Sequence, residues 1–125
     1  MTHFEKRTGL KRLLGTIINA WKGFRWMLCN EEAFQQELLL AVPLTLLALW
    51  LDVPVMSKLA LIGVLFLVLL VEVLNTAIET AIDRIGTELH ELSGLAKDIA
   101  SFAVTLSLIL ACIVWATILW DYWAG

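Results

Sequence analysis

Hydrophobic residues gather in three long stretches of this chain, and the longest uninterrupted run covers residues 59–71. An α-helix of about 20 apolar residues crosses the hydrocarbon core of a bilayer, which is roughly 30 Å thick. The pattern therefore predicts membrane-spanning helices over about residues 33–51, 55–83 and 97–120. The sequence Asp52-Val53-Pro54 predicts a turn between the first two.

The N-terminal part follows a different pattern. Between about residues 6 and 28, apolar positions recur at three- and four-residue steps and alternate with basic ones. This period is typical of an amphipathic helix, and its Lys and Arg residues favour a position at the lipid headgroups. Asn30 is expected to cap the helix that follows, and Gly86 and Ser93-Gly94 to bracket a short polar connection.

These patterns predict an all-α membrane protein with an N-terminal amphipathic surface helix and three transmembrane helices, in one domain of residues 1–125. Composition agrees, because 60% of the residues are hydrophobic, against roughly 45–50% in soluble domains. So short a chain cannot bury the surplus, which must face lipid. The net charge of -3 excludes a nucleic-acid-binding role. Cys29 and Cys112 are expected to be reduced packing residues.

Basic residues are distributed unevenly along the chain. Of nine Lys and Arg residues, six lie in the first 25 positions, two within residues 84–98 and one at Lys58. Positively charged flanks of membrane spans stay on the cytoplasmic side. The N-terminus and the second loop are therefore predicted to be cytoplasmic, and the C-terminus to lie on the opposite face.

The second span continues into a polar segment that carries candidate chemistry. On a helix, Glu72, Asn75, Glu79 and Asp83 lie within an arc of roughly 80°. Ionisable groups at the edge of a span usually face a helix-bundle interior, and like charges on one stripe call for a cation. A solvated helix face is the alternative, although Glu72 directly follows the apolar run.

Other polar residues are predicted to reach the same side of the membrane. Glu31 and Glu37 lie at the start of the first span, and Lys97-Asp98 open the third. Carboxylate oxygens suit Mg²⁺, and basic residues suit phosphates, so the set indicates phosphoryl transfer at an interface. The chain contains no Gly-rich nucleotide-binding loop, so helices would have to hold a nucleotide.

Several blocks of the chain are similar to the bacterial diacylglycerol kinase family of small integral membrane lipid kinases. The resemblance covers nearly the whole chain, and its middle and last blocks are long and specific. The blocks are Ala20-Trp21-Lys22-Gly23; Asn30-Glu31, Ala33-Phe34 and Gln36-Glu37; Trp50-Leu51-Asp52-Val53; Val71-Glu72-Val73-Leu74-Asn75 and Ala77-Ile78-Glu79; Asp83-Arg84-Ile85-Gly86; His90-Glu91-Leu92-Ser93-Gly94; and Ala96-Lys97-Asp98.

The resemblance implies a homotrimer in the bacterial inner membrane, with active sites built from neighbouring subunits at the cytoplasmic interface. The implied reaction transfers the γ-phosphate of ATP, with Mg²⁺, to the primary hydroxyl of sn-1,2-diacylglycerol and gives phosphatidate for phospholipid recycling. Glu72 would be the general base or the group that orients the hydroxyl, with a structural ion partner in the trimer as its alternative role. Glu31 and Glu79 would hold Mg²⁺ on the nucleotide. The residues implied in nucleotide binding are Arg12, Asn19, Glu31, Asn75, Glu79, Glu88, His90, Lys97 and Asp98.

The resemblance implies that residues from all parts of the chain bind the lipid. The implied set is Arg12, Trp21, Arg25, Ala33, Gln36, Glu72, Ser101 and Trp115. For Trp115, ordinary packing is favoured over lipid contact, and for Arg12 membrane anchoring is the alternative role. One departure concerns Asn19, which stands where better-known members of the family carry a Tyr near the nucleotide.

Three other functions are alternatives. Related enzymes phosphorylate undecaprenol, although the Trp50-Leu51-Asp52 turn and the His90–Gly94 block look more like the diacylglycerol type. A small proton-coupled transporter would also place Glu residues in a membrane, but three spans with an interfacial carboxylate stripe fit it poorly. The third alternative is a non-catalytic subunit of a membrane assembly, but such a protein has no need for clustered charged residues.

Overall fold

Four helices make up the computed structural model, which describes residues 8–86 and 90–125. They are α1 (Leu10–Asn30), α2 (Glu32–Trp50), α3 (Val55–Ile85) and α4 (Glu91–Ala124), and the described residues form no strand. α2, α3 and α4 are long and apolar enough to cross a membrane. The predicted all-α membrane fold is therefore confirmed.

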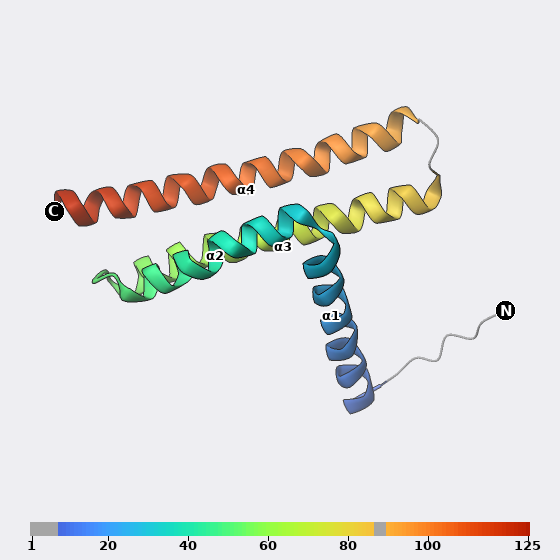
Figure 1. The fold of residues 1–125 in the computed structure, drawn as a ribbon, viewed down its shortest axis with the longest axis horizontal. Helices are drawn as coiled ribbons and strands as arrows, with labels where there is room; N and C mark the ends of the chain where they lie inside the picture. Colours follow the sequence, from blue (N-terminus) through green and yellow to red (C-terminus); the bar gives the residue numbers. More distant parts are fainter. Residues whose placement is uncertain (1–7, 87–89) are drawn as a thin grey trace.

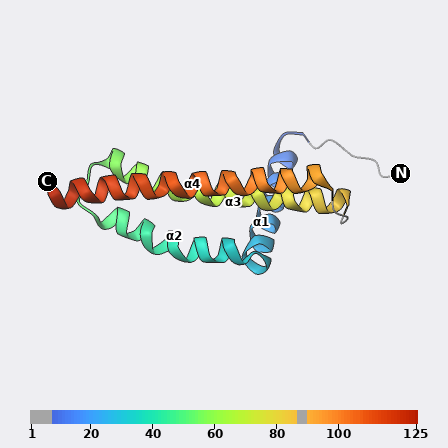
Figure 2. The ribbon, with the colours of Figure 1, turned by 90° about the horizontal axis from the view of Figure 1, so that it is seen from above.

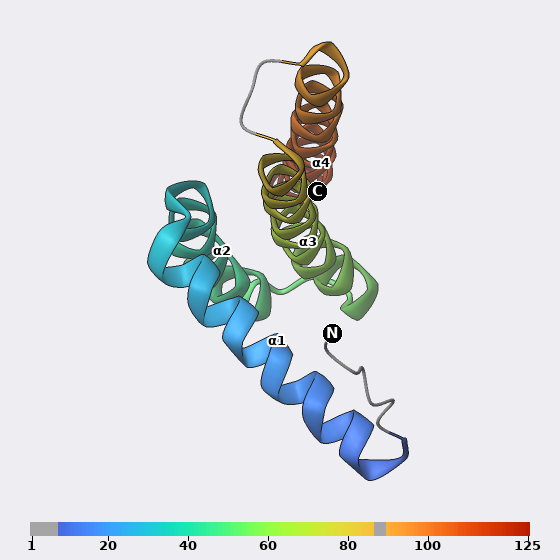
Figure 3. The same cartoon turned by 90° about the vertical axis from the view of Figure 1, so that its right-hand side faces the viewer.

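The three long helices lie alongside one another, and α1 leaves them at a steep angle (Figures 1 and 3). α2 and α4 flank α3, which is the central helix (Figures 2 and 3). With a rise of about 1.5 Å per residue, α3 and α4 are about 46 and 51 Å long. Both exceed the roughly 30 Å hydrocarbon core, so their ends extend beyond it.

A small hydrophobic core joins the three long helices. Leu61 is completely buried in α3, and its carbonyl oxygen accepts a hydrogen bond of 3.1 Å from the indole nitrogen Nε1 of Trp115 in α4. The other buried members of this core are Ala48, Leu51, Val64, Val68 and Ala111. Most other large apolar side chains of the spans are exposed in the single chain, as expected for helices that face lipid or other subunits.

The observed helix ends correct three expectations. α4 begins at Glu91, six residues before the expected start, because the Nδ1 atom of His90 accepts a hydrogen bond from the backbone N–H of Leu92 and caps the helix. Ser93-Gly94 therefore lies inside α4 and is no connection. One helical glycine costs only about 1 kcal/mol, too little to end a long apolar helix.

The junction of α1 and α2 also differs from expectation. Asn30 is the last residue of α1, where its side-chain amide donates a hydrogen bond to the carbonyl oxygen of Trp26 at 2.9 Å, so it does not cap α2. A single extended residue, Glu31, links the two helices. α1 begins at Leu10, and the first two residues expected in it, 6 and 7, lie outside the described residues.

Candidate active site

The polar residues of α3 share one face, and their burial decreases along the helix. Glu72 is only 5% exposed. Asn75 and Glu79, one and two turns further on, are half-buried. The side chain of Asp83 is 59% exposed. Solvent exposure along the stripe therefore increases from the buried Glu72 beside the core to the exposed Asp83 near the end of the helix.

Three other carboxyl groups lie near the carboxyl group of Glu72. Glu37, in the second turn of α2, has its carboxyl group within hydrogen-bonding reach of that of Glu72. Glu31 and Glu79 are near enough for their charges to act on Glu72. Charges of one sign repel each other strongly in a poorly solvated place. The cluster therefore needs a proton or a cation among its oxygens.

Three buried side-chain oxygens near this cluster have no hydrogen-bond partner within the described residues. They are Oε2 of Glu37, Oδ1 of Asn75 and Oγ1 of Thr76. Asn75 is already oriented, because its Nδ2 atom donates a hydrogen bond of 3.4 Å to Oε1 of Glu79. Buried polar atoms in proteins are nearly always satisfied. Two acceptor oxygens and a hydroxyl beside Glu72 are therefore available to a bound cation or hydroxyl group.

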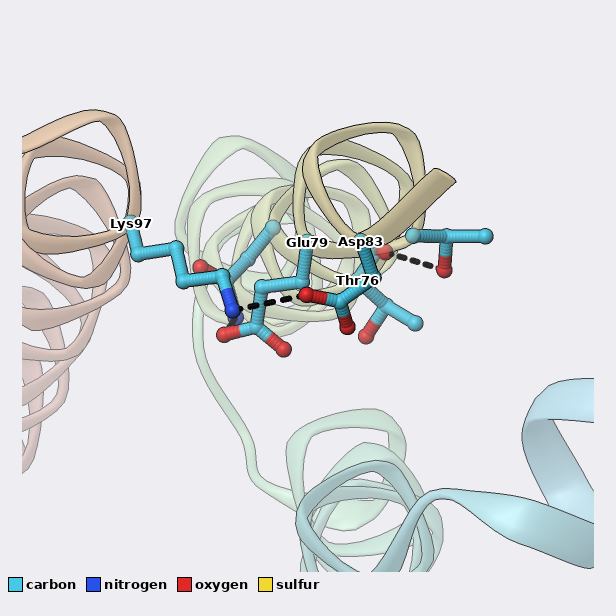
Figure 4. Close-up of polar contacts among 6 residues, drawn as sticks. Thr76, Glu79, Asp83 and Lys97 are labelled. Carbon is cyan, nitrogen blue, oxygen red and sulfur yellow. Dashed lines mark hydrogen bonds and ion pairs between the residues drawn. The ribbon is translucent and has the colours of Figure 1, made fainter. Parts of the chain in front are cut away.

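Lys97 brings a positive charge from α4 to this stripe. Its Nζ atom forms an ion pair of 2.8 Å with Oδ1 of Asp83, and it also lies within electrostatic reach of Glu79. Figure 4 shows the lysine extending across from α4 toward the carboxylates of Asp83 and Glu79. The side chain of Lys97 is 41% exposed, so it remains accessible to an anion that competes with Asp83.

The start of α4 supplies two further predicted nucleotide residues. His90 is exposed and uses Nδ1 to cap the helix. Asp98 is exposed next to Lys97. Glu88, the other predicted residue of this loop, lies outside the described residues.

The predicted residues of α1 do not join the cluster within one chain. Arg12, Asn19, Trp21 and Arg25 are all exposed on this helix. α1 packs against the beginning of α2, where the rings of Phe24 and Phe34 meet edge to face at 6.2 Å. Arg12 is 18 residues before the end of α1 at Asn30, or about 27 Å along the helix axis.

The predicted lipid-binding residues lie in different environments. Ala33 and Gln36 are exposed at the start of α2, where Nε2 of Gln36 donates a hydrogen bond to Oε1 of Glu32 at 3.3 Å. Ser101 is exposed on α4, whereas Trp115 is 9% exposed in the hydrophobic core. The side chain of Trp115 therefore packs in the core, the role that the sequence favoured.

The three long helices form an apolar groove with a volume of about 300 Å³. It runs between α2, α3 and α4, with Glu37 and Trp115 both in its lining. The remaining lining residues are Leu40, Ala41, Leu44, Leu65, Val68, Leu69, Leu108, Ala111 and Cys112. A groove of this composition suits a hydrocarbon chain.

Sequence reasoning missed Glu37 and Thr76 as site residues. Glu37 was predicted to lie on the same side of the membrane as the stripe, but no pattern within α2 shows that it lies close to Glu72 on another helix. Thr76 lies four residues after Glu72, which is one helical turn, and is 5% exposed. Its place on the stripe is the signal that could have found it.

The fold and this cluster define a class of protein: an integral membrane protein with a charged, oxygen-rich site beside an apolar groove. Comparison with known proteins agrees. The family model for prokaryotic diacylglycerol kinase matches residues 18–119. The chain belongs to the prokaryotic diacylglycerol kinase family.

Curated relatives extend this match over nearly the full length. The chain is 44% identical over 115 residues to the diacylglycerol kinase of Escherichia coli (strain K12), covering 92% of this chain and 94% of the relative. It is 42% identical to the diacylglycerol kinase of Pseudomonas aeruginosa over 116 residues, or 93% of this chain and 94% of the relative. For that of Haemophilus influenzae the identity is 41% over 114 residues, or 91% and 97%.

A kinase family implies ATP as the donor and a divalent metal ion beside it. Within the described residues, no group of three His, Cys, Asp or Glu side chains forms a ready-made metal site. Mg²⁺ usually takes only one or two protein carboxylates and completes its shell with phosphate and water oxygens. The carboxylates that act on Glu72 and the unpaired Oδ1 of Asn75 are hard oxygen donors that fit such an ion.

Proposed function

We propose that this chain transfers the γ-phosphoryl group of MgATP to the primary hydroxyl of sn-1,2-diacylglycerol and so forms phosphatidate at the cytoplasmic face of the membrane. Family membership supports the reaction. The observation that carries the assignment to a site is the buried carboxyl group of Glu72, which lies against Glu37 at the end of an apolar groove.

Glu72 is the general base in this proposal. Its carboxylate accepts the proton of the lipid hydroxyl while that oxygen attacks the γ-phosphorus and the bond to the β–γ bridging oxygen breaks. ADP leaves with the electron pair of that bond. The place of Glu72 beside Glu37, which lines the apolar groove, favours this role, because a general base must lie within reach of the proton that it accepts.

Glu31 and Glu79 hold the Mg²⁺ ion in this proposal. The ion would neutralise charge on the phosphate oxygens of the nucleotide. Glu79 is oriented by Asn75, and Glu31 is placed by the link between α1 and α2. Both residues lie within electrostatic reach of the proposed base.

Positive and polar groups around the stripe bind the rest of the nucleotide. Lys97 exchanges part of its contact with Asp83 for phosphate oxygens, which is feasible because both side chains are solvent-accessible. The other nucleotide contacts are assigned to Arg12, Asn19, Asn75, Glu88, His90 and Asp98. Catalysis of this kind depends on positioning and charge neutralisation, so it needs no Gly-rich loop.

The lipid lies with its acyl part along the apolar groove and its hydroxyl at Glu72. Trp115 lines the groove at the end away from the headgroups. Near the interface, the lipid contacts are assigned to Arg12, Trp21, Arg25, Ala33, Gln36 and Ser101. The substrate can therefore react without leaving the membrane.

The working enzyme is a homotrimer in the bacterial inner membrane, with the N-terminus cytoplasmic and the C-terminus periplasmic. The distance along α1 between Arg12 and the α2 junction supports a shared site, since α1 of one subunit can reach the stripe of another. The uneven distribution of Lys and Arg supports the orientation.

Radiolabelled ATP and purified protein in detergent micelles test the proposal. Diacylglycerol is expected to become labelled phosphatidate in the presence of Mg²⁺, and undecaprenol to react far more slowly. Preferential labelling of undecaprenol would overturn the acceptor assignment. Absence of labelling of either lipid by protein that retains its helical circular dichroism would overturn the kinase assignment.

A further inference from the structure

A hydrogen bond that the proposed reaction does not explain crosses the junction between α1 and α2. Nε2 of Gln35, in the first turn of α2, donates to the carbonyl oxygen of Leu28 in the last turn of α1 at 2.8 Å. In one continuous helix, that carbonyl would accept the backbone N–H of residue 32. The extended residue Glu31 interrupts this pattern, and the side-chain amide of Gln35 takes the place of the missing donor.

Gln35 is bonded to both sides of this one-residue link. Its backbone N–H donates to the carbonyl oxygen of Glu31 at 3.1 Å, while its side chain holds the end of α1. The rings of Phe24 and Phe34 also join the two helices, with their centroids 6.2 Å apart. Ring pairs are favourable over a range of distances and tilts, whereas a hydrogen bond weakens steeply when its geometry changes. The bond of Gln35 therefore resists a change in the angle between α1 and α2.

Packing alone restrains α1 only weakly. Gly15 and Met27 are its buried residues, and nearly all its other side chains are exposed. The helix leaves the three spans at a steep angle from the start of α2 (Figure 1). The contacts at the junction therefore determine its direction.

The direction of α1 matters because the helix is a long lever. Arg12 lies about 27 Å along the axis from the end of α1 at Asn30. A swing of about 10° at the junction therefore displaces Arg12 by about 5 Å. Groups that position a substrate lose their effect when they are misplaced by only about 1 Å. Ligand contacts made by α1 thus require a fixed angle at the junction.

We propose that Gln35 is a positioning residue that fixes the angle of α1 and so holds Arg12 and Asn19 at the polar stripe of a neighbouring subunit. This inference rests on the proposed function, which assigns those two residues to the nucleotide. Gln35 acts through α1 and touches no substrate. Its side chain is exposed, so replacing it creates no cavity in the core.

Spin labels on two helices test the angle without reference to activity. The labels are attached at Lys11→Cys on α1 and Leu46→Cys on α2, both exposed positions. The full-length protein also carries Cys29→Ala and Cys112→Ala and is diluted with unlabelled protein, and pulsed electron paramagnetic resonance in micelles measures the distance between the labels. Gln35→Met keeps the side-chain length without the donor and is expected to turn a narrow distance distribution into a broad one. Gln35→Arg restores a donor and is expected to keep the distribution narrow.

Kinetics in mixed micelles of diacylglycerol test whether the angle matters for the reaction. In Gln35→Met, the KM for MgATP is expected to rise about tenfold, because apparent affinity falls with the fraction of subunits whose α1 is at the binding angle. The turnover number is expected to stay within a factor of about two, since the occupied site is unchanged. Gln35→Arg is expected to restore the KM. Thr16→Val is the matched control, because it removes a hydrogen bond of 2.9 Å to the carbonyl oxygen of Arg12 that stays within α1.

An unchanged distance distribution in Gln35→Met would overturn the inference. So would a broad distribution with an unchanged KM, or an Arg variant that behaves like the Met variant. If Gln35→Met does not fold, as judged by thermal unfolding, Gln35→Asn replaces it, since its amide is one methylene shorter and cannot keep the same bond to Leu28. Inactive wild-type protein would overturn the proposed function, and the spin-label comparison would still decide whether Gln35 fixes α1.

Discussion

Residues 55–71 and 72–85 of α3 form one continuous helix, but the same buried face serves different purposes in the two halves. Leu61, Val64 and Val68 lie on this face and pack in the hydrophobic core. Glu72 and Thr76 continue it at four-residue steps and are equally buried. The face changes from apolar to polar over one turn without a break in the helix.

The difference between the halves lies in how the buried groups are satisfied. In the apolar half, the buried polar contact with α4 is complete, because the indole N–H of Trp115 donates to the carbonyl oxygen of Leu61 at 3.1 Å. In the polar half, oxygens of Asn75 and Thr76 lack partners within the described residues. The first half is therefore built for stability. The second keeps unsatisfied groups, as sites that bind ligands do.

The largest expected effect separates chemistry from stability. Glu72→Gln is expected to lower the turnover number by about 1000-fold, because the amide cannot accept the lipid proton. Its thermal unfolding temperature is expected to be no lower than that of the wild type, since the change removes one of several neighbouring negative charges. The two measurements are a radiolabel assay and a melting curve in the same micelles.

A lower melting temperature together with the lost activity would place Glu72 among the residues that hold the fold. Full activity would remove it from the reaction altogether. Either result would remove the contrast between the two halves of α3.

The opposite pattern is expected in the apolar half. Leu61→Ala creates a cavity at a completely buried position and is expected to lower the free energy of unfolding by about 3 kcal/mol. Turnover at a temperature where the variant remains folded is expected to match that of the wild type. Unfolding in mixed micelles measures the first quantity. A large loss of turnover in folded protein would show that the core also shapes the site.

A smaller effect is expected at the accessible end of the stripe. Lys97→Met is expected to raise the KM for MgATP about tenfold, since a charged hydrogen bond to phosphate is lost. Asp83→Asn, which breaks the same ion pair from the other side, is the matched control and is expected to leave this KM nearly unchanged. Equal changes in both variants would mean that Lys97 acts only by holding Asp83.

Local patterns in the sequence predicted the helices and the stripe well. The second span was expected over 55–83 and extends over Val55–Ile85, and the first was expected over 33–51 and extends over Glu32–Trp50. Both follow from apolar runs and one Pro-containing turn. The spacing of Glu72, Asn75, Glu79 and Asp83 gave their common face because helical geometry alone determines it.

Features that depend on contacts between helices or on a cap could not be predicted in this way. The early start of α4 depends on a hydrogen bond from Leu92 to His90, which competes with the turn tendency of Ser93-Gly94. The contact of Glu37 with Glu72 depends on how far α2 is shifted along α3. A repeat of 3.6 residues within one helix carries no information on that shift.

The one-residue link at Glu31 has a consequence for how the enzyme responds to its surroundings. Glu31 is extended between two helices, with φ −104° and ψ 107°, and it lies within electrostatic reach of Glu72. Any change in the angle between α1 and α2 must therefore rotate the backbone of Glu31. Tilting of α1 by a curved or crowded bilayer would thus be transmitted directly to a carboxylate of the candidate site.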